Sequence, residues 1–173
     1  MLVGNRVRLR AMVTTDAEAI LKIYEEGIQT GHATFEAEFP DWHKWDSGHL
    51  TQCKWLTEEE ETVLGWGALT QASPRKVYSG VAEVSIYVSL NAQNQGIGSI
   101  LLERLIISSE ESGFWTLQAQ VFPENKIIIH AREKHGFKKS GTPRQLAPMF
   151  FGSMAGEWRD PVVMERRSKI AGI

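Results

Sequence analysis

The sequence predicts an α/β or α+β fold, in which a mixed β-sheet carries helices on both faces, and three observations support this prediction. Residues 81–88 are dense in β-branched and aromatic side chains, which is typical of a strand. Residues 17–24 and 98–106 carry apolar side chains at helical spacing, so each is expected to pack one face on a sheet. The elements follow one another in the order β-α-α-β-β-β-α-β-α-β-β, and 173 residues suit a single domain spanning residues 1–173.

The N-terminal half is expected to contain a strand, two helices and a hairpin. Residues 7–10 alternate apolar and basic side chains, as a half-buried strand does. An amphipathic helix is expected over about 15–27, and a short tryptophan-rich helix after Asp41. Two β-rich runs between residues 52 and 70 predict a hairpin, with the acidic run 58–61 as its solvated turn.

The C-terminal half is expected to alternate helices and strands after the strand 81–88. Buried apolar residues predict a helix over 98–112, and a strand follows over 115–121. A second helix is expected over 125–136, because Gly136 is well placed to end it. The last strands are expected to start at Phe137 and near Val162.

Composition argues against several classes of function. The 19 basic and 21 acidic side chains give a formal net charge of −2, which is not the electrostatic footprint of a nucleic-acid-binding protein. Cys53 is the single cysteine, so no intramolecular disulfide can form and a reducing compartment is expected. No signal peptide or membrane span is expected, which predicts a cytoplasmic protein without a membrane partner. The five histidines lack the spacing of metal ligands, so no metal is expected.

Gly96-Ile97-Gly98 lies between the strand 81–88 and a helix, and three ligand-binding interpretations compete with a plain tight turn. A dinucleotide-binding loop needs a small residue at position 101, which is a leucine. A Walker loop needs Gly-Lys-Ser/Thr, a tripeptide that the sequence lacks. The remaining pattern, Gln-x-x-Gly-x-Gly before a helix, offers backbone N–H groups and a helix dipole to an anion such as a pyrophosphate. A plain tight turn would carry the same two glycines.

Three segments resemble the GNAT acetyltransferase superfamily. The segment Gln93–Gly98 resembles its acyl-CoA pyrophosphate loop, and residues 82–88 resemble its fourth strand. Asn125, with Gly136-Phe137 following at the family's spacing, resembles the start and end of its fourth helix. The resemblance covers most of residues 7 to 167. It implies a mostly antiparallel central sheet whose fourth and fifth strands splay apart.

Within the superfamily, the chain resembles the phosphinothricin N-acetyltransferase group most. Tyr78, Glu83 and the segments 158–160 and 162–164 carry this resemblance. It implies an acetyl-CoA-dependent N-acetyltransferase that acts on the primary amine of a small amino acid or analogue, such as phosphinothricin, methionine sulfoximine or methionine sulfone. Relatives are often homodimers, so a homodimer is expected.

The resemblance also implies how acetyl-CoA is bound. The pantetheine arm would lie between the splayed strands and pair with strand backbone, and a backbone N–H near Val88 would polarise the thioester carbonyl. Asn125 would touch the cofactor arm, while its position at a helix start also suits an N-cap. The implied cofactor-binding residues are Ile86, Tyr87, Val88, Gln93, Asn94, Gln95, Gly96, Ile97, Gly98, Ser99 and Asn125.

Glu83 is the candidate general base. An amine attacks a thioester only as the free base, so a side chain must accept a proton near neutral pH. Glu83 shares one strand face with Ser85 and Tyr87, because side chains alternate with a period of two, and partial desolvation there would raise its pKa. The resembling group has its general base at this place, acting directly or through water. From the residues alone, the alternative is a surface glutamate paired with a basic neighbour.

Two residues are candidates for contact with the acceptor. Arg75 precedes the strand 81–88, and the resemblance implies that it pairs with an α-carboxylate; a solvated loop charge is the alternative. Phe35 lies in a segment that resembles the wall of the group's acceptor pocket; a core aromatic is the alternative.

The chain departs from the family at two places. Many relatives have tyrosine or histidine five residues before Phe137, where this chain has Arg132. Arginine is a poor acid because its pKa exceeds ~12, so the thiolate is stabilised by charge, or protonated by Tyr87, His130 or water. Residues 93–95 also lack the positive charges that are frequent in this loop, so the backbone amides and the helix dipole carry the phosphate binding.

Two other functions compete with amino-acid acetylation. Transfer to a protein N-terminus or to a polyamine is one alternative; a polyamine pocket would need clustered acids, which Glu36, Glu38 and Asp41 could supply. A non-catalytic acyl-CoA sensor is the alternative from another class, favoured by Arg132 and by the neutral loop.

Overall fold

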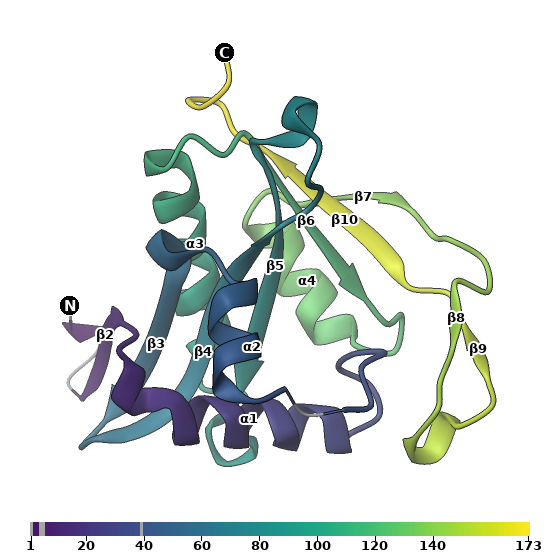
Figure 1. The fold of residues 1–173 in the computed structure, drawn as a ribbon, viewed down its shortest axis with the longest axis horizontal. Helices are drawn as coiled ribbons and strands as arrows, with labels where there is room; N and C mark the ends of the chain where they lie inside the picture. Colours follow the sequence, from purple (N-terminus) through teal and green to yellow (C-terminus); the bar gives the residue numbers. More distant parts are fainter. Residues whose placement is uncertain (1, 4–5, 39) are drawn as a thin grey trace.

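The computed structural model describes residues 2–3, 6–38 and 40–173, and an eight-stranded sheet forms its centre (Figure 1). Neighbouring strands of this sheet are antiparallel, apart from the parallel pair β5 and β6. A separate pair, β8 (Ala147–Pro148) and β9 (Trp158–Arg159), forms a small hairpin arm at one edge. In spatial order the strands of the large sheet are β1 (Leu2–Val3), β2 (Val7–Ala11), β3 (Lys54–Glu59), β4 (Thr62–Gln71), β5 (Val81–Val88), β6 (Thr116–Val121), β10 (Val162–Arg167) and β7 (Lys138–Gly141).

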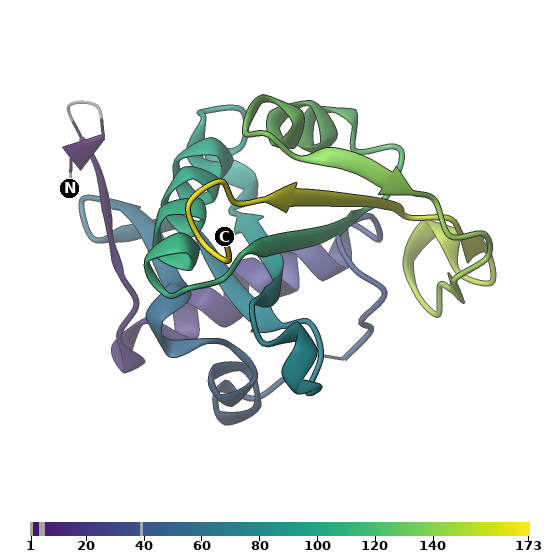
Figure 2. The ribbon, with the colours of Figure 1, turned by 90° about the horizontal axis from the view of Figure 1, so that it is seen from above.

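Helices cover both faces of the sheet (Figure 2). The helices α1 (Ala17–Gln29) and α2 (Trp42–Gly48) lie on one face, and α3 (Ile97–Glu111) and α4 (Lys126–Lys134) lie on the other. None of the helices in the described residues is long and apolar enough to cross a membrane. Short 3₁₀ turns occur at Thr14–Asp16, Thr51–Cys53, Lys76–Tyr78, Leu90–Ala92 and Gly152–Met154.

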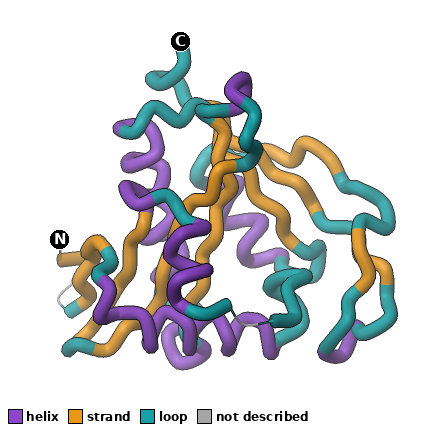
Figure 3. The backbone as a smooth tube through the Cα atoms, viewed as in Figure 1, coloured by secondary structure: helices purple, strands orange, loops and turns teal. Residues whose placement is uncertain are grey.

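The expected fold class is confirmed, including the mixed sheet and the helices on both of its faces. The strand over 81–88 has the bounds that its composition predicts, and the other expected elements are shifted by only a few residues, whereas the two-residue strands β1, β8 and β9 were not expected. Figure 3 shows the strands grouped at the centre of the molecule with the helices around them.

The acidic run 58–61 differs from the prediction of a solvated turn. Glu58 belongs to β3 and is buried, and its Oε2 accepts a hydrogen bond from Arg10 Nε at 2.9 Å. Arg10 also holds Asp16, at 2.7 Å, so the two carboxylates and one guanidinium join β2, β3 and the start of α1. The turn is only Glu60-Glu61, both with positive φ. The acidic run alone does not indicate the pairing of Glu58 with Arg10, because a cross-strand partner is not visible in the local sequence.

Alternation along β5 divides the core into two clusters. Ala82 and Val84 pack with Leu102 and Leu105 of α3. On the opposite side of the strand, Tyr87 packs with the α1 cluster that includes Ile20, Ile23, Leu56, Trp66 and Ala68. Glu83 shares its side of β5 with Tyr87, because side chains two and four residues apart project from the same face. Glu83 therefore faces the side of the sheet that α1 covers.

The strands β5 and β6 separate after a short contact. Their parallel pairing is confined to Val81 with Thr116, Ala82 with Leu117 and Glu83 with Gln118. Beyond Glu83 the two strands diverge, while β6 stays paired with β10 along its whole length (Figure 1). The expected splaying of the two strands is thus confirmed, and it leaves backbone of β5 without a strand neighbour on that side.

Candidate active site

A cavity of about 260 Å³ opens where β5 and β6 diverge. Its walls come from β5, from the end of β6, from α4 and from the segment 33–36 that follows α1. The titratable side chains on the described walls are Glu36, Glu83, Tyr87 and Arg132. The cavity thus brings two carboxylates and one guanidinium together beside apolar surface.

Glu83 occupies the point where the strand pairing ends. Its side chain is half-buried, and burial raises the pKa of its carboxyl above the ordinary value, with the positive charge of Arg132 acting in the opposite direction. A carboxylate with a raised pKa is a better proton acceptor than an exposed one. The geometry and the electrostatics of Glu83 therefore suit a general base.

Arg132 is the buried cation of the cavity. It is 7% exposed, and its Nη1 has no hydrogen-bond partner among the described residues. Burial lowers the pKa of its guanidinium to about 10, and Glu83 opposes this effect. The side chain is therefore a cation at neutral pH, with its guanidinium 5.9 Å from the ring centroid of Phe137.

Tyr87 is fixed in the cavity wall by aromatic neighbours on the α1 side. Its ring stacks on Trp66 with centroids 4.8 Å apart and meets the ring of Tyr24 edge-on at 4.9 Å. Gly27 of α1 lies directly beneath the ring, since a Cβ there would lie 2.5 Å from Tyr87 Cδ1. Burial raises the pKa of the Tyr87 phenol, so it is a weaker acid than a free tyrosine.

The segment 33–36 is held against the cavity by two contacts. Phe35 packs edge-on against Phe122 of the β6 end, with ring centroids 4.9 Å apart. Asn125 Nδ2 donates a hydrogen bond to the His32 carbonyl oxygen at 2.7 Å. Asn125 stands at the N-cap position of α4, but its side chain holds this segment instead of capping the helix.

The hairpin arm is tied to the same region by Arg159. This side chain is 3% exposed, its Nη2 donates to Glu124 Oε2 at 2.9 Å, and its guanidinium lies 3.8 Å from the ring centroid of Phe122. Arg159 Nη1 also donates to the Gly31 carbonyl oxygen, at 3.4 Å, which joins the arm to the segment that follows α1. The arm therefore supports the side of the cavity formed by Phe35 and Phe122.

The glycine loop follows β5 and leads into α3. Gly96 has φ 81°, a left-handed conformation that favours glycine, and a Cβ there would meet nothing within 4 Å. The amides of Ser99 and Ile100 both donate to the Gly96 carbonyl oxygen, whereas the first amides of a helix have no partner within it. The open space and the amide donors fit a phosphate group at this helix start.

The sequence-predicted residues divide into those in the cavity and those outside it. Glu83, Ile86, Tyr87, Asn125 and Phe35 line the cavity. Val88 and the loop residues 93–99 lie beyond it, further along the chain towards α3. Arg75 is on an exposed loop, with its guanidinium 5.4 Å from the ring centroid of Tyr78, and does not line the cavity.

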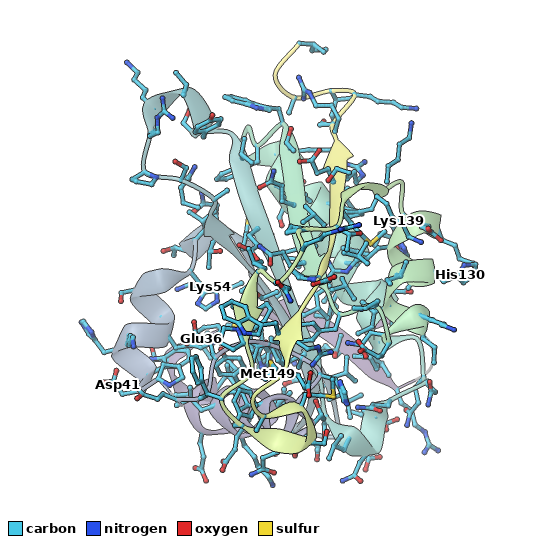
Figure 4. All side chains as sticks on the ribbon, turned by 90° about the vertical axis from the view of Figure 1, so that its right-hand side faces the viewer. Glu36, Asp41, Lys54, His130, Lys139 and Met149 are labelled. Atoms are coloured by element: carbon cyan, nitrogen blue, oxygen red, sulfur yellow. The ribbon has the colours of Figure 1, made fainter. Side chains whose placement is uncertain are left out.

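His130 likewise lies outside the cavity, on the outer surface of α4 (Figure 4). Sequence reasoning missed Gln120 and Phe122 at the end of β6, and Ile128 of α4. Ile128 could have been found, because residues 125, 128 and 132 recur at helical spacing on one face. The β6 residues had no such signal, since their exposure to the cavity depends on where β5 diverges.

The chain matches the model of the Acetyltransferase (GNAT) family over residues 17–137, which is more than half of its length. It belongs to this family, and it is an N-acetyltransferase that takes its acetyl group from acetyl-CoA. The described residues contain no group of three or more histidine, cysteine, aspartate or glutamate side chains that could hold a metal ion.

Similar proteins carry names from the phosphinothricin acetyltransferase group. YwnH of Bacillus subtilis, a provisionally assigned phosphinothricin acetyltransferase, is 32% identical over 82% of this chain and 90% of its own length. A phosphinothricin N-acetyltransferase of Alcaligenes faecalis is 29% identical over 91% of this chain and 81% of its own. The solved structure of a GNAT superfamily phosphinothricin acetyltransferase from Sinorhizobium meliloti, in complex with acetyl-CoA, has a TM-score of 0.84 and 25% identity, covering 96% of this chain and 91% of that one. The resemblance expected from the sequence is confirmed.

Proposed function

We propose that this enzyme acetylates the primary amine of a small amino acid or amino-acid analogue of the phosphinothricin, methionine sulfoximine or methionine sulfone type. Glu83 is the general base in a direct transfer. The observation that carries the proposal is the half-buried carboxylate of Glu83, with its raised pKa, in a cavity between diverging strands. The names of the similar proteins support this class of acceptor.

Acetyl-CoA supplies an activated acetyl thioester when it is bound. The amides of residues 93–98 and the hydroxyl of Ser99 hold its phosphates at the start of α3, where the helix dipole also favours negative charge. Backbone of Ile86, Tyr87 and Val88 pairs with the pantetheine arm, because these residues follow the point at which β6 leaves β5. Asn125 contributes by fixing the segment 33–36 beside the pantetheine arm.

The acceptor occupies the α1 side of the cavity. Phe35 forms an apolar wall, and Glu83 accepts the proton that the amine must lose before or during attack. Arg75 lies on the loop that enters β5, a few residues before Glu83, so it would meet an acceptor carboxylate that extends out of the cavity in that direction. Substitution of Arg75 by alanine tests this contact.

The test of the acceptor class is thiol release from acetyl-CoA across a panel of amines. The panel contains amino acids, methionine sulfone, methionine sulfoximine, phosphinothricin, polyamines and short peptides. We expect turnover on the amino-acid analogues, and we expect Arg75→Ala to raise KM only for acceptors with a carboxylate. Turnover confined to polyamines or peptides would overturn the proposed acceptor class.

A polyamine acceptor is the second candidate, because Glu36 and Glu83 both line the cavity. The buried cation Arg132 opposes it, since a polycation would be repelled. We also propose that the protein acts as a cytoplasmic homodimer, each chain forming one domain over residues 1–173. Sedimentation at several protein concentrations would test this assembly.

A further inference from the structure

Arg132 is a buried charge without a hydrogen-bond partner for one of its terminal nitrogens. It is 7% exposed and lines the cavity, and its Nη1 is unpaired among the described residues. Its interaction with Glu83 is electrostatic, and no hydrogen bond joins the two side chains. A buried guanidinium normally has its donors paired, so an unpaired one in a cavity indicates that an anion binds there.

The position of Arg132 in the fold distinguishes between the anions that the reaction offers. Arg132 belongs to α4, on the same face of the sheet as α3, whose first residues follow the glycine loop. Glu83 and Tyr87 reach the cavity from the opposite, α1-covered face. The phosphate loop at the start of α3 brings the CoA arm and its sulfur in from the face that carries α4, whereas the amine approaches Glu83 from the α1 side. Arg132 therefore lies on the side of the departing sulfur.

We propose that Arg132 stabilises the departing CoA thiolate by its charge and takes the place of a general acid. This inference rests on the proposed function. Starting from the neutral amine, the nitrogen bonds to the acetyl carbon and passes one proton to Glu83. The carbon–sulfur bond breaks and leaves its electron pair on sulfur. The products are the N-acetyl amine, protonated Glu83 and the thiolate of CoA, which is paired with Arg132 until it is released.

The other candidate acids fit the cavity less well. His130 is on the outer surface of α4, 4.0 Å from Glu133, and does not line the cavity. Tyr87 does line it, but its aromatic neighbours hold it on the α1 side and burial makes its phenol a weaker acid. A permanent cation needs no proton to stabilise an anion, so the departure of sulfur does not require either residue.

The test compares the binding of CoA and desulfo-CoA to the full-length enzyme from pH 6 to pH 9 by calorimetry. An opposite charge at close range lowers the pKa of a group by about 1 to 3 pH units, here from the ordinary thiol value of roughly 8.5. CoA should therefore gain affinity over desulfo-CoA by about tenfold or more as the pH rises through this window. Desulfo-CoA carries the same phosphates and meets the same Glu36, Glu83 and Tyr87, so it corrects for their titration.

Three variants sharpen the test. Arg132→Met keeps the apolar stem and should abolish the pH-dependent difference between the two ligands, whereas Arg132→Lys should keep part of it. Arg104→Met is the matched control, because Arg104 packs on Trp55 outside the cavity, and it should behave as wild type. The thiolate absorbance of bound CoA in the ultraviolet provides an independent measure of the same pKa.

The outcomes separate this inference from the proposed function. If CoA and desulfo-CoA bind with equal affinity at every pH, Arg132 does not stabilise a thiolate, although acetyl transfer stands. If Arg132→Met leaves the thiol pKa unchanged but raises KM for carboxylate acceptors alone, Arg132 binds the acceptor instead. If neither ligand binds wild type, the proposed use of acetyl-CoA fails together with the inference.

Discussion

Gly27→Ala is the substitution that most directly tests how the cavity wall is built. A methyl group at this position would lie 2.5 Å from Cδ1 of Tyr87, well inside contact distance. The ring cannot easily move away, because it is stacked on Trp66 and meets the edge of Tyr24. Such overpacking costs about 1 to 3 kcal/mol, whereas alanine in a helix gains about 1 kcal/mol over glycine. The variant should therefore lose up to about 2 kcal/mol of unfolding free energy.

A double-mutant cycle measures the clash itself. In a Tyr87→Ala background the methyl group meets no ring, so Gly27→Ala should stabilise by about 1 kcal/mol. The coupling energy between the two positions should then be about 1 to 3 kcal/mol, obtained from urea unfolding of the four proteins. Gly48→Ala, at the end of α2 with open space around it, is the matched control and should stabilise or be neutral. Equal stabilisation by Gly27→Ala in both backgrounds would refute the contact.

Two further substitutions test the ion pair at the N-terminus and the phosphate loop. Asp16→Asn should lose about 1.5 to 3 kcal/mol at pH 7, because Arg10 then keeps only Glu58 of its two charged partners. Hydrogen bonding to Arg10 lowers the pKa of Asp16 below its unfolded value of about 3.9, so this contribution is present above pH 3.9 and is lost as the pH falls through the folded pKa. Urea unfolding of wild type and variant at pH 7 and pH 3 should show the difference shrinking, and a constant difference would contradict the assignment. Gly96→Ala should weaken acetyl-CoA binding by about tenfold, since a non-glycine residue at φ 81° costs about 1 to 2 kcal/mol and the loop would relax; calorimetry showing unchanged affinity would exclude this loop as the phosphate site.

Local sequence patterns predict the helices and strands of the fold, but not every side-chain pair that joins them. The strand over 81–88 and the glycine turn after it follow from β-branched composition and from backbone requirements, both of which are local properties. The acidic neighbours of Glu58 predict a turn, whereas its ion-pair partners, Arg8 and Arg10 of β2, lie about fifty residues away in the sequence. Long-range pairing of this kind is decided by tertiary structure.

The sequence predicts some residues of the candidate site and misses others. Period-two alternation placed Glu83 and Tyr87 on one face, and both line the cavity. The cavity itself depends on where β6 leaves β5, which no local pattern encodes, so Gln120 and Phe122 were not found. In the sequence, Arg132 stands out only because many family members have tyrosine or histidine at this position. Its burial and its unpaired nitrogen became visible once α4 was packed against the sheet.

The proposal that Glu83 accepts the proton of the attacking amine is tested most directly by comparing Glu83→Gln with wild type on an active acceptor. We expect kcat to fall by about 100-fold or more while the affinity for acetyl-CoA stays the same, because the amide keeps the shape of the side chain but cannot accept the proton. Wild-type kcat/KM should rise with pH through a pKa above the ordinary glutamate value of about 4.3, and the variant should lack this step. A variant with wild-type kcat and the same pH profile would show that Glu83 is not the general base.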